Sequence, residues 1–461
     1  MDIIANVCNY SVMKKPRVTS PTNMPSTLHG NTSESGGQAS GHKREEAQKG
    51  THTSNSARAG TWSALQHKTF RNFWIASFFA YIGAAMHGVG AAWLMTELDS
   101  SPLMVGLVQG ALNLSIFLVV MPAGVLSDMI NRKWVMAGAL TAIMATVGII
   151  GLLTLNNLIT PSSLLFLTFI FGISVALLSP AMQATVPDLI NSSELPSAVT
   201  LNGLGSSTGR AIGPGLAGLL LTTMGVGWMF MLNIFTFVSL SLVIFFWHND
   251  YWKGKPKQTL FWKAFKEGLY FTKSSHGFKN LLIKSSVSFI PISVLLALIP
   301  LIVIEHLNSG PGTLGIILSC FGVGSVVCSL ILSRLYQHFS RHTVINLAVV
   351  IYSIAIILIV STDQLYMVSI AMLIAGIAWT AVMTSINISA QLLLPDAIRA
   401  RGLSISMMAM MGSVALGSVI WGQTAELFGL QRTYFVAGLL GLTVPLLTMK
   451  FRIEEDILVD K

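Results

Sequence analysis

Long apolar stretches, separated by short polar connections, recur along the chain from about residue 70 onward. A helix needs about 20 mostly apolar residues to cross the hydrocarbon core of a bilayer. Twelve windows satisfy this requirement, with boundaries defined to within a few residues. They are 73–96, 103–126, 134–156, 163–185, 198–224, 227–247, 281–304, 312–335, 342–361, 364–394, 399–424 and 431–451. The pattern therefore predicts an all-α membrane protein with 12 transmembrane helices.

The composition supports a membrane protein, and the missing motifs exclude several classes of enzyme and metal site. Hydrophobic residues make up 52% of the 461 residues and charged residues only 10%, whereas soluble domains carry about 25% charged residues. The three cysteines show no spacing typical of metal ligands or of a redox pair. P-loop, HExxH and Ser-His-Asp patterns are missing from the sequence. We therefore expect no enzyme activity, no cofactor and no metal site.

The positions of the charged residues predict an orientation, because cytoplasmic loops carry an excess of Lys and Arg. One set of connections holds Arg132, Lys133, Arg334, Arg341, Arg399, Arg401 and several lysines between residues 253 and 279. The opposite set holds Glu97, Asp99, Glu305, Asp363 and Glu426, with Arg432 as its clear basic residue. We therefore expect both termini in the cytoplasm, and the net charge of +9 does not indicate a nucleic-acid partner.

The polar segments divide the chain into parts. Residues 1–60 are rich in Ser, Thr and Gly and are predicted to be a disordered cytoplasmic tail. The loop 248–280 mixes aromatic residues with lysines, which predicts an amphipathic helix on the inner leaflet. We expect six-helix bundles at 62–247 and 281–451, and a short cytoplasmic tail at 452–461.

The two predicted bundles look related to each other. Several residues recur 208 positions later in the chain, in corresponding places of the two halves. The matched positions are Phe70 and Phe278, Asn72 and Asn280, Gln183 and Gln391, Pro187 and Pro395, Asp188 and Asp396, Leu195 and Leu403, and Gly209 and Gly417. Parallel six-helix repeats with a site between them are a transporter design. We therefore predict two pseudo-symmetric bundles around a central cleft.

The connection after the second span carries a recognisable motif. It contains Gly124, Asp128, Arg132 and Lys133. This pattern resembles the signature of the major facilitator superfamily (MFS) at the same place, although Asn131 stands where glycine is usual. Asn tolerates left-handed backbone, so a tight turn remains possible. We interpret the motif as a cytoplasmic latch between moving parts; the alternative is charge that only sets the topology.

The fifth span carries a glycine-proline pattern. Gly205, Gly209, Gly213, Pro214 and Gly218 lie at spacings that form a smooth stripe along a helix, which lets a neighbouring helix approach closely. The pattern resembles the antiporter motif in the fifth helix of MFS exporters. The resemblance implies efflux rather than uptake, while the bare spacing is also compatible with ordinary helix packing.

Arg210 stands inside the same span, about 18 Å deep at about 1.5 Å per residue. A charge in hydrocarbon costs at least roughly 2.5–3.5 kcal/mol, and no acidic residue falls well inside any predicted span. We expect Arg210 to face an aqueous cleft and to contact either an anionic group of the cargo or backbone carbonyls.

Other polar residues are predicted to line the same cleft. An unperturbed histidine side chain has a pKa of about 6.5, which makes His87 a candidate proton carrier, although lone histidines in helices more often serve packing. The remaining cleft candidates are Gln109, Asn113, Asn233, Trp379 and Asn387.

Longer strings narrow the resemblance. The segments 91–112, 179–203 and 390–429 are similar to those of bacterial transmembrane secretion effectors, a branch of the MFS that includes the enterobactin exporter. The resemblance implies a 12-helix, two-bundle fold and secondary active transport of a small organic molecule, such as a siderophore. It also implies a multi-pass monomer in the lipid bilayer of the bacterial inner membrane, with proton coupling. Multidrug efflux, metabolite uptake and a non-transporting transceptor remain as alternatives.

Overall fold

The computed structural model describes residues 62–191, 194–246, 270–395 and 398–451, without the side chains of residues 125 and 127–129. The predicted tails at 1–60 and 452–461, and most of the predicted amphipathic helix in the loop 248–280, lie outside the described residues. The described residues form long α-helices joined by short turns, with no strand among them.

The long helices follow the predicted windows. In the first half they are α1 (Lys68–Leu98), α2 (Pro102–Met129), α3 (Arg132–Leu155), α4 (Pro161–Thr185), α5 (Leu195–Met224) and α6 (Val226–Phe245). In the second half they are α8 (His276–Leu301), α9 (Pro311–His338), α10 (Arg341–Val360), α11 (Leu365–Leu393), α12 (Arg399–Phe428) and α13 (Leu430–Leu447). Short helical turns lie at Ser63–Gln66, Val186–Asp188 and Ile302–His306.

Eleven of the described helices are long and apolar enough to cross a membrane. The long helix outside this group is α5, which is 30 residues long but is rich in Gly and Ser and contains Arg210. Its low hydropathy reflects its position: a helix that packs on neighbours from both halves needs small residues more than lipid-compatible ones.

Local sequence signals explain where the helices begin. Ser101 accepts a hydrogen bond from the Met104 N–H at the start of α2, and Pro102 occupies the first turn. Thr160 and Ser163 form a capping box at the start of α4. The turns that join α5 to α6 and α12 to α13 contain Gly225 and Gly429, whose positive φ angles of 80° and 87° favour glycine.

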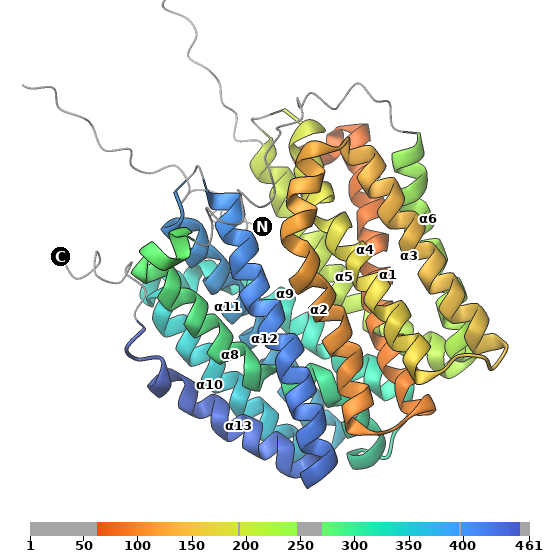
Figure 1. Ribbon diagram of the computed structural model, residues 1–461, viewed down its shortest axis with the longest axis vertical. Helices are drawn as coiled ribbons and strands as arrows, with labels where there is room; N and C mark the ends of the chain where they lie inside the picture. Colours follow the sequence, from red (N-terminus) through yellow and green to blue (C-terminus); the bar gives the residue numbers. More distant parts are fainter. Residues whose placement is uncertain (1–61, 192–193, 247–269, 396–397, 452–461) are drawn as a thin grey trace, which may run out of the picture.

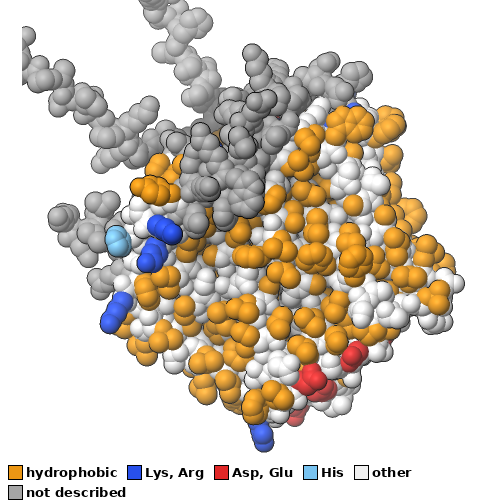
Figure 2. Space-filling view, in the orientation of Figure 1, with side chains coloured by type: hydrophobic (Ala, Val, Ile, Leu, Met, Phe, Trp, Pro, Cys, Tyr) orange, Lys and Arg blue, Asp and Glu red, His pale blue; other side chains and the backbone are white. Residues whose placement is uncertain are grey.

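The helices pack as two groups of six. Helices α1–α6 contact mainly one another, as do α8–α13, and two broad interfaces join the groups: α2 with α12, and α5 with α9. Figure 1 shows the first half, in red to yellow-green, beside the second half, in green to blue, with α2 and α12 adjacent at the boundary. Hydrophobic side chains cover most of the described face in Figure 2, and acidic side chains lie at one end of it.

Candidate functional site

The contact between α2 and α12 is tight at one end of the molecule. A Cβ atom added to Gly106 would lie 2.7 Å from the Ser418 carbonyl oxygen, and one added to Gly422 would lie 2.9 Å from the Pro102 carbonyl oxygen. These distances mean that the two backbones touch near the start of α2 and the end of α12. The halves are therefore closed against each other at this end.

The contact between α5 and α9 is built in the same way. A Cβ atom added to Gly218 would lie 2.8 Å from Gly315 Cα, and one added to Gly315 would lie 2.8 Å from the Pro214 carbonyl oxygen. Gly205, Gly209 and Gly213 instead lie against α1. The predicted glycine-proline motif therefore serves two interfaces, one inside the first half and one between the halves.

A charged group also bridges the halves at the closed end. The Glu426 carboxylate of α12 accepts a hydrogen bond of 3.3 Å from the Leu103 N–H in the first turn of α2. A carboxylate at a helix N-terminus is stabilised by the unpaired N–H groups and the helix dipole. We call this contact, together with the glycine contacts of the two interfaces, the closed gate.

The opposite ends of the same helices are more open. A Cβ atom added to Gly124, near the end of α2, or to Gly203, near the start of α5, would meet no described atom within 4 Å. In Figure 1, α2 and α12 diverge toward this end of the molecule. The structure is therefore closed where α2 begins and open where α2 ends.

Arg210 lies at the middle of α5, and its side chain is exposed. The neighbouring Gly209 lies against α1 and Ala211 against α9, so the guanidinium stands beside both interfaces. Tyr81 of α1 packs against the neighbouring Gly209, and its hydroxyl donates to Asn202 Oδ1 at 3.4 Å. Among the described side chains, the structure pairs Arg210 with no carboxylate. This cluster of Arg210, Tyr81 and Asn202 can bind an anion.

His87 is placed differently from the sequence-based expectation. Its side chain is fully buried, stacks on Phe171 of α4 with ring centroids 3.5 Å apart, and meets Phe230 of α6 edge-on. Neither ring nitrogen has a hydrogen-bond partner among the described atoms. Because α1 turns this ring toward α4 and α6, His87 belongs to the core of the first half and does not line the opening.

The other predicted cleft residues fall into two groups. Asn233 is fully buried and donates to the Gly83 carbonyl at 3.0 Å, so it ties α6 to α1. Asn113 is also buried and donates to the Gln109 carbonyl within α2, while the Gln109 side chain is partly exposed. Asn233 and Asn113 thus satisfy helix backbone rather than face an open space.

In the second half the candidates lie on α11. Trp379 is partly buried and packs against an aromatic group formed by Phe289, Phe321 and Tyr352. Asn387 is exposed, and its Oδ1 accepts from Gln391 Nε2 at 2.7 Å. Of these two residues, Asn387 is the one that is available to solvent or cargo.

Arg132 and Lys133, of the motif after α2, contact other helices of the first half. Arg132 Nη1 donates to Asp188 Oδ2 at 2.6 Å and to the Ala184 carbonyl at 2.5 Å, and Lys133 Nζ donates to the Phe245 carbonyl at 3.3 Å. The Asp128 side chain lies outside the described residues. These contacts join the start of α3 to the ends of α4 and α6 and do not reach the second half.

Asn131 has a role other than the one expected for it. Its φ is −56°, so it is not left-handed; instead its side chain accepts a hydrogen bond from the Lys133 N–H and caps α3. At the position where the family usually has glycine, Asn131 therefore serves as the N-cap residue of α3.

Sequence reasoning missed Tyr81, Asn202, Gly106 and Glu426. Glu426 was predicted only as one of the acidic residues of the outer connections, and its contact with α2 was not. A single sequence offers no signal that the distant helices α2 and α12 meet at Gly106 and Glu426. Among the described residues, no group of three His, Cys, Asp or Glu side chains could hold a metal ion.

The family model of transmembrane secretion effectors matches residues 59–458. The chain belongs to this family. The staphyloferrin A transporter of Staphylococcus aureus is 21% identical over 391 residues, covering 83% of this chain and 98% of that protein. The enterobactin exporter EntS of Escherichia coli O1:K1 is 31% identical over 178 residues, covering 38% of this chain and 42% of the exporter.

Solved structures of similar fold are also transporters. The nucleoside transporter NupG superposes with a TM-score of 0.69 at 14% identity, covering 83% of this chain and 98% of that one. A bacterial homologue of the lysosomal transporter Spinster, in an inward-facing unoccupied conformation, gives a TM-score of 0.65 at 14% identity, with coverage of 83% and 97%. The chain is thus a multi-pass membrane transporter with the MFS fold, and not an enzyme.

Proposed function

We propose that this transporter exports a small organic anion from the bacterial cytoplasm by alternating access, with a siderophore as the leading candidate. The observation that carries the proposal is Arg210, an exposed guanidinium at the middle of α5 with no carboxylate partner among the described residues. A cation held inside a membrane protein needs compensation, and an anionic cargo supplies it when bound. The printed names of the relatives, a staphyloferrin A transporter and an enterobactin exporter, support this cargo class.

The opening lies at the end from which a cytoplasmic cargo would enter, as export requires; the fifth-helix motif and the relatives' names, rather than the opening, favour export over uptake. The open end carries Arg132, Lys133 and Arg399, and the closed end carries the acidic residues Glu97 and Glu426. The bias of Lys and Arg toward cytoplasmic loops therefore favours an inward-facing conformation. In this orientation both termini are cytoplasmic, and Arg210 meets cargo that arrives from inside. Proton coupling is part of the proposal, as is a monomer in the inner membrane.

Multidrug efflux is the second candidate function. Methionine side chains adapt to varied ligands, and α12 carries four of them at 407, 408, 410 and 411. Met410 and Met411 are buried, but Met407 and Met408 are partly exposed, so the choice between the two cargo classes depends on Arg210 and on the printed names of the relatives.

Arg210→Ala tests the anion site. Transport measured in everted membrane vesicles should fall by about 10- to 100-fold, the loss expected when a hydrogen bond to a charged group is removed. Arg210→Lys should recover part of the activity, because lysine restores the positive charge but lacks the planar guanidinium that can donate two parallel hydrogen bonds. Arg432→Ala, which removes an arginine in the first turn of α13 at the closed end, is the matched control and should leave transport intact. Normal transport by Arg210→Ala at normal membrane abundance would reduce Arg210 to a packing residue.

Two assays on a deletion strain separate the candidate cargoes. The first measures iron chelator in spent medium under iron starvation, and the second measures growth across a drug panel. Loss of chelator with unchanged drug tolerance supports siderophore export, whereas the reverse selects multidrug efflux. Collapse of vesicle transport by a protonophore checks the proton coupling.

A further inference from the structure

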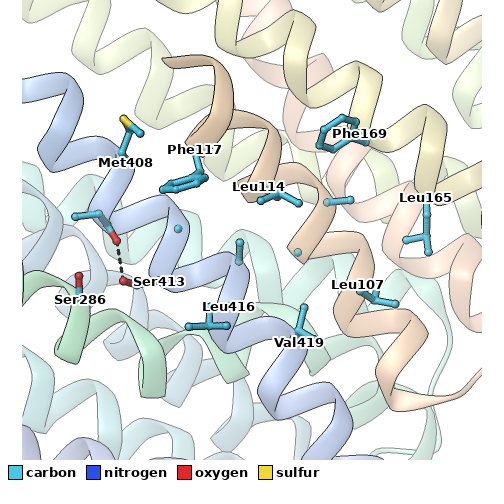
Figure 3. A pocket seen from close by; sticks show the side chains of 15 residues that line it. Leu107, Leu114, Phe117, Leu165, Phe169, Ser286, Met408, Ser413, Leu416 and Val419 are labelled. Atoms are coloured by element: carbon cyan, nitrogen blue, oxygen red, sulfur yellow. Dashed lines mark hydrogen bonds between the residues drawn. The ribbon is translucent and has the colours of Figure 1, made fainter. Parts of the chain in front are cut away.

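A cavity of about 640 Å³ lies along the boundary of the two halves, at the contact of α2 with α12. Its walls include Leu107, Leu114 and Phe117 of α2, Leu165 of α4, and Leu416 and Val419 of α12. Figure 3 shows these side chains around one hollow, with Ser286 of α8 at its far side. We call this hollow the boundary groove. Its volume falls within the range of about 300–1,000 Å³ that is typical of ligand sites.

The boundary groove faces the lipid and not the interior of the transporter. Leu114 and Leu416 in its wall are 41% and 55% exposed. At about 100° per residue, the polar Gln109 lies on the side of α2 away from these wall residues, and Asn113 is turned about 100° from their mean direction. The hydroxyl of Ser413, also in the wall, is already used by the Ala409 carbonyl at 2.7 Å. The groove therefore offers contacts to hydrocarbon and almost none to polar groups.

The length of the groove matches one leaflet of a bilayer. From Leu107 to Phe117 along α2 the rise is about 15 Å at about 1.5 Å per residue, which is half of the roughly 30 Å hydrocarbon core. An acyl chain that enters from the end where α2 begins would therefore lie within the groove along most of its length.

The charges beyond the groove indicate the headgroup of such a lipid. Glu97, Asp99 and Glu426 lie at the end of the molecule where α2 begins and α12 ends, about two helical turns past the groove. Acidic side chains are visible at this end in Figure 2. Arg432, in the first turn of α13, lies at the same end, so the four side chains together carry a net negative charge. This net charge attracts an ammonium group and repels a lipid whose headgroup is purely anionic.

We propose that the boundary groove binds an acyl chain of a phospholipid with an ammonium headgroup, such as phosphatidylethanolamine, and that this lipid stabilises the conformation with the closed gate. The walls come from α2 and α4 of one half and from α8 and α12 of the other. Relative movement of the halves changes the shape of the groove, so the lipid binds the two conformations with different affinities. A ligand shifts a conformational equilibrium by its differential affinity for the two states.

Native mass spectrometry of the purified transporter tests the site. Wild-type protein should retain phosphatidylethanolamine in preference to phosphatidylglycerol. Ala409→Phe places a ring in the groove and should lower retention about tenfold, the loss expected when about two chain methylenes are displaced. Ala145→Phe, the same change at an exposed position on α3 outside the groove, is the matched control. Equal retention by the two variants, or a preference for phosphatidylglycerol, would overturn the proposal.

A second measurement uses the unaltered protein. Phosphatidylethanolamine with a diazirine in its acyl chain should label peptides of α2 and α12 more strongly than the α3 peptide around Leu152, which is 56% exposed. Even labelling of all three helices means that only ordinary surrounding lipid is present, and it refutes the site. An excess of unlabelled phosphatidylethanolamine should reduce the label on α2 and α12, whereas an excess of phosphatidylglycerol should leave it; equal competition by the two lipids likewise refutes the site. Neither readout depends on the identity of the cargo.

Discussion

Single residues in this transporter have roles that their type alone does not reveal. Arg210 and His87 are both polar residues within predicted spans, yet one is exposed at the middle of α5 and the other is enclosed by Phe171 and Phe230. The sequence could predict that each residue is unusual, because polar groups are rare in spans. It could not predict which way each side chain points, since that depends on how α1 and α5 pack.

His87→Phe should preserve transport and raise the thermal stability. The substitution removes two buried ring nitrogens that lack partners among the described atoms, and an unsatisfied buried polar group costs about 1–3 kcal/mol. Phenylalanine also keeps the stacking on Phe171. The melting temperature of the detergent-solubilised protein and vesicle transport check this expectation. A normally folded variant that has lost transport would instead assign proton transfer to His87.

At the scale of helices, small residues decide where the two halves meet. The sequence predicted the glycine stripe of α5 and its close packing, but not that α1 uses one part of it and α9 another. The sequence did not predict that Gly106 of α2 contacts α12, because a single glycine in an apolar helix is compatible with many kinds of packing. Which helix packs against a given face depends on contacts between residues that are hundreds of positions apart. A single sequence does not show which distant residues are in contact.

Gly106→Val should drive α2 away from α12 and disfavour the closed gate. The added Cβ would stand 2.7 Å from a backbone oxygen of α12, so the helices must separate. Spin labels on Ser100→Cys and Leu427→Cys, with the native cysteines replaced by serine, should report a longer distance in this variant. Gly138→Val on α3, where an added Cβ meets no described atom within 4 Å, is the control. Unchanged distances with Gly106→Val would mean that α2 relaxes locally.

At the scale of the whole molecule, the duplicated sequence and the span pattern predicted the architecture well. Hydrocarbon forces every backbone group into an internal hydrogen bond, so apolar windows alone predict the helices. The repeat then predicts two similar groups of six. The conformation was not predictable, because the proposed alternating states would share the same helices and differ in which ends of α2, α5, α9 and α12 touch.

Glu426→Ala should shift the balance of conformations away from the closed gate. Loss of a carboxylate from a helix N-terminus costs about 0.3–1 kcal/mol, which corresponds to a change of about two- to fivefold in population. The same spin-label pair measures this change. Glu97→Ala is the matched control, because Glu97 accepts its hydrogen bond from Trp93 in its own helix. If both substitutions shift the populations equally, the effect is one of general surface charge.

The double use of α5 constrains how this transporter can evolve a new cargo. Larger side chains at Gly209 or Gly213 would disturb the packing of α5 on α1, and one at Gly218 would disturb its packing on α9. Few replacements at these positions are therefore tolerable. Variation in cargo preference should therefore accumulate on helices with freer surfaces, such as α11 around Asn387. A comparison of natural variants that differ in cargo would then show α5 nearly constant and α11 diverse.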